Sequence, residues 1–89
     1  MATVTLAAVQ QLLAMASPVD PEEITPEKHL VRDLEMDSFG MMDAVLSFER
    51  EFGIDIPDRD LRLFDTVQDV LVYLAERTGS AVAPHASTV

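Results

Sequence analysis

The twenty residues 33–52, DLEMDSFGMMDAVLSFEREF, decide the fold of this chain. Asp37 has the side chain of a helix N-cap, and Ser38 follows it at the first helical position. Directly after the stretch stands Gly53, a residue that favours the left-handed conformation with which many helices end. The sequence therefore predicts a helix that starts at Ser38, ends at Phe52 and has a signal at each end.

The predicted helix has two apolar rows. At about 100° per residue, one row has the spacing of a core-facing stripe; it consists of Met41, Val45, Phe48 and Phe52. The second lies roughly 130° further round; it consists of Phe39, Met42 and Leu46. A helix in so small a chain can give only one face to the core, so the second row is predicted to face a partner. The alternative is one broad core face, which would bury Glu49 without an obvious counter-charge.

Before this helix the sequence predicts another helix and a long connection. The first helix is expected over residues 3–16, with Thr3 or Thr5 as its N-cap, and Ser17-Pro18 ends it. Residues 18–36 have one helix-start signal, at Asp20-Pro21, but Thr25-Pro26 limits it to about a turn. Long ordered loops need anchors in the core. The expected anchors are Val19, Ile24, Leu30 and Leu34.

After this helix the sequence predicts a packed loop, a short helix and a last helix. The short helix is expected from Pro57-Asp58 to about Leu63, and Asp65-Thr66 caps the last one, with Gln68 or Asp69 completing a capping box. No strand pair is visible, so the fold class is all-α, a bundle of three main helices and a short one. Residues 1–79 form one domain, and the uncharged residues 80–89 are expected to be a disordered tail.

Composition excludes several classes of function. The 89 residues include 6 Lys and Arg against 16 Asp and Glu, a net charge of −10, which disfavours nucleic acid as a partner. Eleven acids and three bases lie from position 33 to position 69, a net charge of −8, which would suit enzymes with basic patches. Cysteine is absent. No apolar run approaches the ~20 residues of a membrane span, and no signal peptide is visible, so a cytoplasmic protein is expected.

Ser38 is the candidate functional residue, because its hydroxyl would lie beside first-turn amides that favour a phosphate. Catalysis by Ser38 is not expected. The histidines, His29 and His85, lie in the loop and the tail, and no Gly-x-Ser-x-Gly elbow is present. The acids of residues 55–60 lack the glycine and glutamate of a calcium-binding loop, so neither catalytic nor metal-binding residues are predicted.

Asp37-Ser38-Phe39 resembles the Asp-Ser-Leu signature of acyl carrier proteins. The resemblance runs from about Val9 to Leu74. It includes Asp33-Leu34, Glu49-Arg50-Glu51-Phe52, Ile54-Asp55-Ile56-Pro57-Asp58 and Thr66-Val67-Gln68-Asp69, in the order and spacing of that family. The resemblance implies the same helical bundle. It also implies that a phosphopantetheinyl transferase attaches phosphopantetheine from coenzyme A to Ser38, and that its thiol carries acyl groups as thioesters.

The resemblance further implies that partner enzymes bind the serine helix. The positions that match its recognition residues are Asp37, Phe39, Met42, Asp43, Leu46 and Glu49. Gly40 and Arg50 depart from the family, because many members have acids there, and Phe39 replaces a leucine. The expected partners are an acyltransferase, a ketosynthase or acyl-activating enzymes with basic patches, and the carrier is expected to be a monomer. The gap between this helix and the last two is a candidate acyl pocket, lined by Val45, Leu61, Phe64 and Leu71.

Two alternatives stay open beside an acyl carrier of a fatty acid, polyketide or other specialised pathway. A peptidyl or aminoacyl carrier would use the same attachment chemistry, but such domains tend to have a glycine-rich approach to the serine, whereas residues 33–37 here are acidic and apolar. An unmodified helical adaptor would present its acidic surface to a basic partner. Binding that survives the replacement of Ser38 would favour the adaptor.

Overall fold

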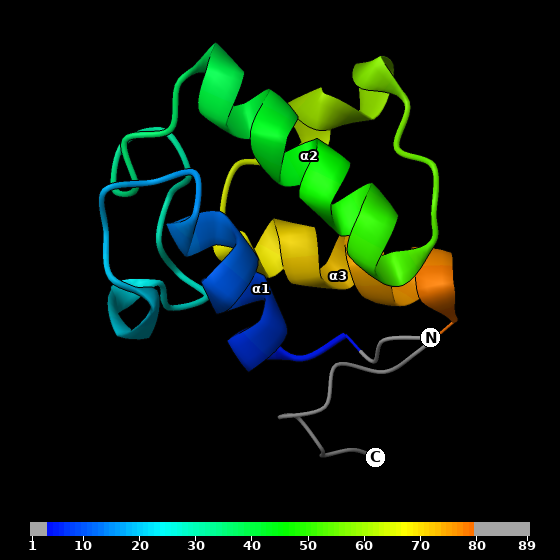
Figure 1. The fold of residues 1–89 in the computed structure, drawn as a ribbon, viewed down its shortest axis with the longest axis horizontal. Coiled ribbons are helices and arrows are strands. Elements are labelled where there is room, and N and C mark those ends of the chain that lie inside the picture. Colours follow the sequence, from blue (N-terminus) through cyan, green and yellow to red (C-terminus); the bar gives the residue numbers. More distant parts are fainter. Residues whose placement is uncertain (1–3, 80–89) are drawn as a thin grey trace.

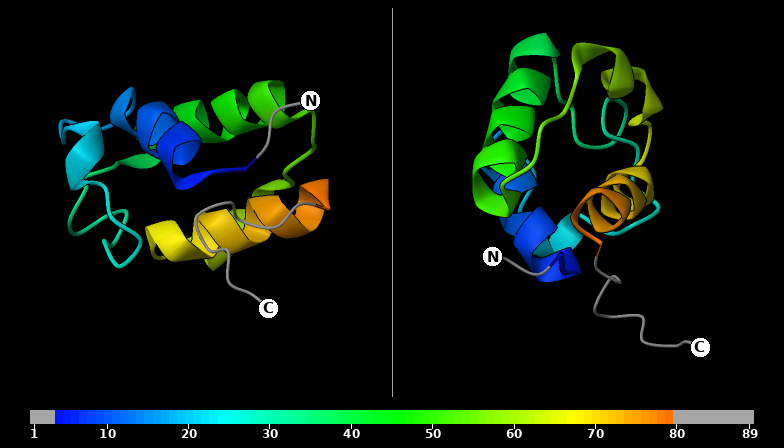
Figure 2. Two further views of the ribbon diagram at one scale, coloured as in Figure 1. Left: turned by 90° about the horizontal axis from the view of Figure 1, so that it is seen from below. Right: turned by 90° about the vertical axis from the view of Figure 1, so that its right-hand side faces the viewer.

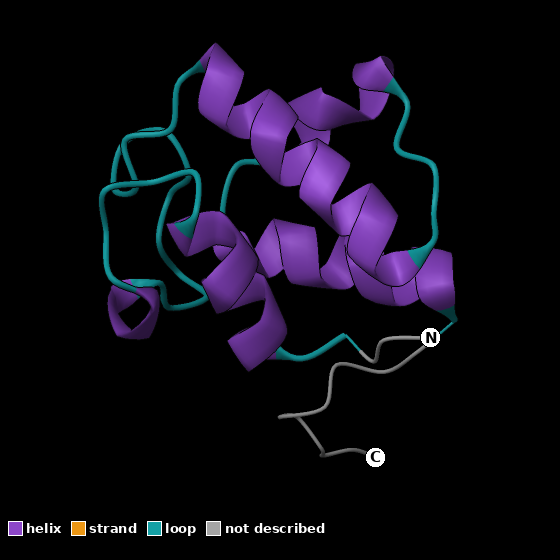
Figure 3. Cartoon of the chain, viewed as in Figure 1, coloured by secondary structure: helices purple, strands orange, loops and turns teal. Residues whose placement is uncertain are grey.

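The computed structural model describes residues 4–79 of the chain, and these form a bundle of helices without strands (Figures 1 and 3). The elements are α1 (Leu6–Ala14), η1 (Pro21–Glu23), α2 (Ser38–Phe52), η2 (Asp58–Leu63) and α3 (Val67–Thr78). The predicted all-α class is confirmed. The predicted tail, residues 80–89, lies outside the described residues.

Helix α2 begins and ends where the sequence predicts. The Asp37 side chain accepts a hydrogen bond from the Gly40 N–H at 2.8 Å, which satisfies one of the free amides of the first turn. At the other end Gly53 has φ 65°, and its N–H donates to the Glu49 carbonyl. Both ends of α2 are therefore fixed by residues within it or adjacent to it.

The other helices begin after the residues that cap them, with one difference from the prediction. Helix α1 starts after Thr5, whose hydroxyl accepts from the Ala8 N–H at 3.0 Å, so it is shorter than the predicted 3–16. Thr66 and Asp69 form the predicted capping box of α3. The short helix predicted from Pro57-Asp58 to about Leu63 is η2, a 3₁₀ helix that follows the extended Pro57.

The core lies between two layers. Helices α1 and α2 form one layer and α3 lies across the other (Figure 2). The residues of α2 that are buried in the core are Ala44, Val45, Phe48 and Phe52. The predicted loop anchors Ile24, Leu30 and Leu34 are fully buried, and Val19 is packed against the core at its edge. The long connection is thus part of the packed structure.

The long connection also pairs with the start of α3, which the sequence did not indicate. The Leu30 N–H donates to the Asp65 carbonyl at 2.9 Å, and the Val67 N–H donates to the Lys28 carbonyl at 3.0 Å. An isolated antiparallel bridge joins His29 to Thr66 between them. These bonds hold the loop rigidly against α3, so the residues that follow, up to Ser38, enter α2 from a fixed position.

Helices α1, α2 and α3 have 9, 15 and 12 residues. A membrane-spanning helix needs about 20 predominantly apolar residues. Within residues 4–79 no helix is long and apolar enough to cross a lipid bilayer.

Candidate functional site

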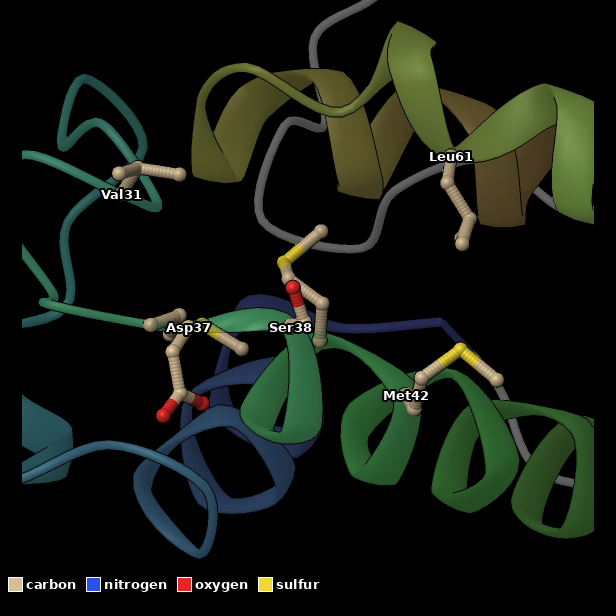
Figure 4. A pocket seen from close by; sticks show the side chains of 7 residues that line it. Val31, Asp37, Ser38, Met42 and Leu61 are labelled. Atoms are coloured by element: carbon tan, nitrogen blue, oxygen red, sulfur yellow. The ribbon is translucent and has the colours of Figure 1, made fainter.

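Ser38 is the first residue of α2, and its side chain is exposed. Within residues 4–79 its hydroxyl makes no hydrogen bond. The backbone N–H groups of Ser38 and Phe39 precede the first intrahelical bond and have no acceptor in the described part of the chain. The carboxylate of Asp37, engaged in the cap, points away from the Ser38 hydroxyl (Figure 4). The serine oxygen is therefore accessible, and the carboxylate of the preceding residue, Asp37, does not face it.

A hollow of about 610 Å³ opens beside Ser38. Three elements form it, namely the end of the long connection, the first turns of α2, and η2. Figure 4 shows the Ser38 hydroxyl directed into the space between Val31 and Leu61. The lining residues are Val31, Met36, Asp37, Ser38, Met41, Met42 and Leu61. Apart from Asp37 and Ser38 these side chains are apolar, and three of them are methionines, whose flexible thioethers adapt to ligands of different shape.

This hollow differs from the acyl pocket that the sequence predicted. Of the four predicted residues only Leu61 lines it. Val45, Phe64 and Leu71 are buried in the core cluster, between 2% and 5% exposed. They point between the layers, whereas the hollow lies at one end of α2, where the loop and η2 face each other. A pocket lined by these three would require the core to open, so that part stays a prediction.

The second apolar row of α2 is exposed and does not belong to the core, and its contact with a partner stays a prediction. Phe39 is 81% exposed, Leu46 53% and Met42 43%. The three residues differ in which depression they line, however. Met42 lines the hollow beside Ser38, Leu46 lines a separate groove against α1, and Phe39 lines neither. The sequence could place these residues on one helix face. Which depression each residue lines depends on where α1 and η2 lie against α2.

The two predicted acidic recognition residues of the α2 face differ in their surroundings. Asp43 is exposed. Glu49 is half-buried, and its Oε2 accepts a hydrogen bond from the Ile56 N–H at 2.8 Å. The Glu49 carboxylate therefore ties α2 to the segment that leads to η2. No local pattern indicates this contact, because it joins residues seven positions apart across the turn at Gly53.

A polar cluster holds η2 against α3. Asp60 of η2 accepts a hydrogen bond from the Tyr73 hydroxyl at 2.6 Å and an ion-paired bond from Arg77 at 3.0 Å. These contacts, the Tyr73 bond first, lower the pKa of Asp60. Burial, followed by the hydrogen bond to Asp60, raises the pKa of Tyr73. Because η2 carries Leu61, the cluster fixes one wall of the hollow.

The described residues place no hydrogen-bonding side chain at Ser38. A serine nucleophile needs a base within hydrogen-bond reach, and no side chain in residues 4–79 bonds to the Ser38 hydroxyl. The Nδ1 of His29 accepts from the Arg32 N–H at 3.3 Å, within the loop. In the described part of the chain, no three His, Asp or Glu side chains gather as metal ligands.

Comparison with known proteins finds a matching family model and several similar proteins. Residues 7–74 match the family model described as a phosphopantetheine attachment site. The meromycolate extension acyl carrier protein of Mycobacterium leprae is 38% identical over 69 residues, which cover 78% of this chain and 60% of that protein. The protein of the same name from Mycolicibacterium aurum is 36% identical over 69 residues and is covered to 71%. The chain thus spans well under the full length of these relatives.

Proposed function

Because the chain belongs to the acyl carrier protein family, we propose that Ser38 is its attachment site and that it carries acyl intermediates between enzymes. The prosthetic group of this family is phosphopantetheine, and its members are carriers, not catalysts. The group would join the Ser38 oxygen as a phosphodiester. It supplies a thiol, which this cysteine-free chain lacks.

The observation that carries the proposal is the exposed Ser38 hydroxyl at the N-terminus of α2, at the mouth of an apolar hollow. The unbonded amides of Ser38 and Phe39 and the positive end of the helix dipole favour a phosphate there. The charge of Asp37 does not repel the phosphate directly, since its carboxylate faces away and accepts a hydrogen bond from the Gly40 N–H. The residues present therefore fit the group.

The chemistry of the hollow favours an acyl cargo over an aminoacyl one. Its walls are apolar side chains of Met36, Met41, Met42, Val31 and Leu61, with no charged group to pair with an ammonium except Asp37, whose carboxylate serves the cap. The relatives are named for the extension of meromycolate. We infer a carrier for a pathway that lengthens acyl chains. The first carbons of the acyl chain would lie in the hollow. A longer acyl chain would reach Val45, Phe64 and Leu71 only if the core opens.

The proposed partners come from the chemistry of the family, and the surface charge indicates how they would be attracted. A phosphopantetheinyl transferase must modify Ser38, and acyltransferases, ketosynthases or acyl-activating enzymes must load and use the cargo. Enzymes with basic patches would be attracted to a chain of net charge −10 and bind it faster at low salt. Asp43 and the exposed residues Phe39 and Met42 lie close to Ser38 in α2, where such an enzyme would make contact. Linking the substrate to one such protein raises its effective concentration at each partner.

The attachment is tested by incubating the cysteine-free chain with coenzyme A and a phosphopantetheinyl transferase, and by measuring its intact mass. We expect the mass of one phosphopantetheine group to be added to the wild type and to Ser47→Ala, and none to Ser38→Ala. Ser47 is a matched control, because it lies on the same helix but lines the α1 groove. A Ser38→Ala protein that still gains the group would contradict the proposal.

The class of cargo is tested on the modified protein with competing donors. Loading enzymes that supply malonyl or longer acyl groups should acylate the thiol, and those that supply amino acids should not. Efficient aminoacylation instead would identify a peptidyl or aminoacyl carrier. Purification of only unmodified protein from its natural host, with partner binding that survives Ser38→Ala, would identify an adaptor.

A further inference from the structure

A second depression lies on α2, away from Ser38. It is a groove of about 290 Å³ between the C-terminal end of α1 and the middle of α2. The lining residues are Leu12, Met15, Ala16, Asp43, Leu46, Ser47 and Arg50. None of them lines the hollow beside Ser38. We call this depression the α1–α2 groove.

The walls of the α1–α2 groove are held in place by a close backbone approach. A Cβ atom placed on Gly40 would lie 2.9 Å from the Ala16 carbonyl oxygen, so the chain just after α1 packs directly on the first turn of α2. The Ser17 hydroxyl donates to the Leu34 carbonyl at 2.7 Å, which fixes the chain just after α1. The groove therefore exists in the free protein and does not have to be formed by a partner.

The groove has an apolar middle and opposite charges at its two ends. Met15 is 78% exposed and Leu46 53% exposed, although both are large apolar side chains. Asp43 and Arg50 are seven residues apart on α2, about two helical turns or ~10.5 Å along the axis. Within residues 4–79 neither of these charges takes part in an ion pair. The groove thus presents an anion, an apolar site and a cation in a row.

We propose that the α1–α2 groove binds a helical segment of a partner protein in which an apolar side chain lies between a basic and an acidic one. The apolar side chain would contact Met15 and Leu46. The basic side chain would lie opposite Asp43 and the acidic one opposite Arg50, two turns apart on the partner helix as they are on α2. The inference concerns a surface other than the Ser38 site and does not depend on attachment of the prosthetic group.

Charge decides between this occupant and the other candidates. A uniformly basic surface suits most of this acidic chain, but at Arg50 it would place like charges together, which is how an interface rejects a wrong partner. A second copy of the chain would bring two net charges of −10 together, and that repulsion disfavours self-association. A segment of mixed charge meets neither objection. Arg50 would therefore determine which partners bind this face.

The test uses the full chain, labelled with ¹³C at the methionine methyl groups, and two synthetic helical peptides. One peptide has lysine, leucine and glutamate in a row at successive turns, and the other has lysine in place of the glutamate. We expect the mixed peptide to shift the Met15 signal and to bind about threefold to tenfold more tightly than the all-lysine peptide. The Met41 signal, from the other hollow, should stay in place.

Two variants with exposed substitutions make the test specific. Arg50→Glu should reverse the preference, so that the all-lysine peptide binds more tightly. Arg62→Glu, a matched change on η2 outside the groove, should leave the preference unchanged. Equal binding of both peptides, or no Met15 shift at millimolar peptide, would overturn the proposal. A Met15 signal that depends on protein concentration without peptide would overturn it in favour of self-association.

Discussion

Glu35 is the one described residue other than glycine with a positive φ, at 56°. It lies three positions before Ser38, where the loop turns into α2. The left-handed conformation costs a residue with a side chain roughly 1–2 kcal/mol, which glycine avoids, although glycine loses more entropy on folding. We expect Glu35→Gly to raise the free energy of unfolding by about 0.5 kcal/mol, measured by urea denaturation. Glu35→Ala, which removes the charge but keeps the strain, should give no such gain. An equal gain in both variants would attribute it to charge.

The Asp60 cluster makes part of the stability dependent on pH. Because the pKa of Asp60 is lower in the folded chain than its ordinary value of 3.8, its contribution is complete above that value. The contribution is lost as the pH falls through the lower pKa. We therefore expect Asp60→Asn to destabilise the protein at pH 7 and to differ less from the wild type at pH 2. Thermal unfolding at both pH values measures this difference.

Asp58 provides the control for that measurement. It lies on the same 3₁₀ helix, is exposed, and its side chain forms no hydrogen bond or ion pair in the described residues. Asp58→Asn should leave both the stability at pH 7 and its pH dependence close to the wild type. If the two variants behaved alike, the Tyr73 and Arg77 contacts would not contribute to the stability.

At the scale of elements, Gly40 decides how closely α1 approaches α2. Alanine favours helix over glycine by about 1 kcal/mol, but a Cβ at Gly40 would meet the Ala16 carbonyl, a backbone atom that cannot turn aside. Overpacking of this kind costs about 1–3 kcal/mol. We expect Gly40→Ala to lower the free energy of unfolding by about 1 kcal/mol net and to shift the Met15 methyl signal.

Gly53 separates this steric effect from a general effect of glycine substitution. Its φ is 65° and no atom lies within 4 Å of a Cβ placed there. Gly53→Ala should therefore cost about 1 kcal/mol through backbone strain alone and leave the Met15 signal unchanged. A Gly40→Ala protein more stable than the wild type would show that α1 can move away from α2 without cost.

Whether an element could be predicted depended on how local its signals are. The ends of α2 and the capping box of α3 were predictable, because Asp37, Gly53 and Thr66 act on residues within four positions. The early end of α1 was not, since the chain there is fixed by the bond from Ser17 to Leu34. The pairing of the long connection with the start of α3 likewise joins residues far apart in sequence. No local pattern encodes such contacts.

The site, too, has parts with local sequence signals and parts that depend on contacts between distant residues. Ser38 could be singled out because it follows the N-cap of α2 and because the surrounding sequence resembles a known family. The hollow beside it could not be described correctly, since Val31 and Leu61 reach it from the loop and from η2. Glu49 was predicted as a recognition residue from its place on α2, but its bond to Ile56 depends on how the chain turns after the helix. Its role toward partners stays a prediction.

At the scale of the whole molecule, α2 has a distinct environment along each side of its exposed face. On one side is the hollow beside Ser38, with three methionines, and on the other is the α1–α2 groove. A carrier protein has to shield its acyl group and also has to be recognised by several enzymes. The separation of the two depressions would allow the acyl group and the partner to be recognised independently. The net charge of −10 would act over longer distances and guide the first encounter.

The central claim, that Ser38 carries the prosthetic group, is tested most directly by tandem mass spectrometry of protein purified from its natural host. Trypsin cleaves after Arg32 and Arg50, so one peptide, residues 33–50, contains both Ser38 and Ser47. We expect this peptide to have the added mass of phosphopantetheine, and fragment ions to place that mass on Ser38. An unmodified peptide, or a group located on Ser47, would contradict it.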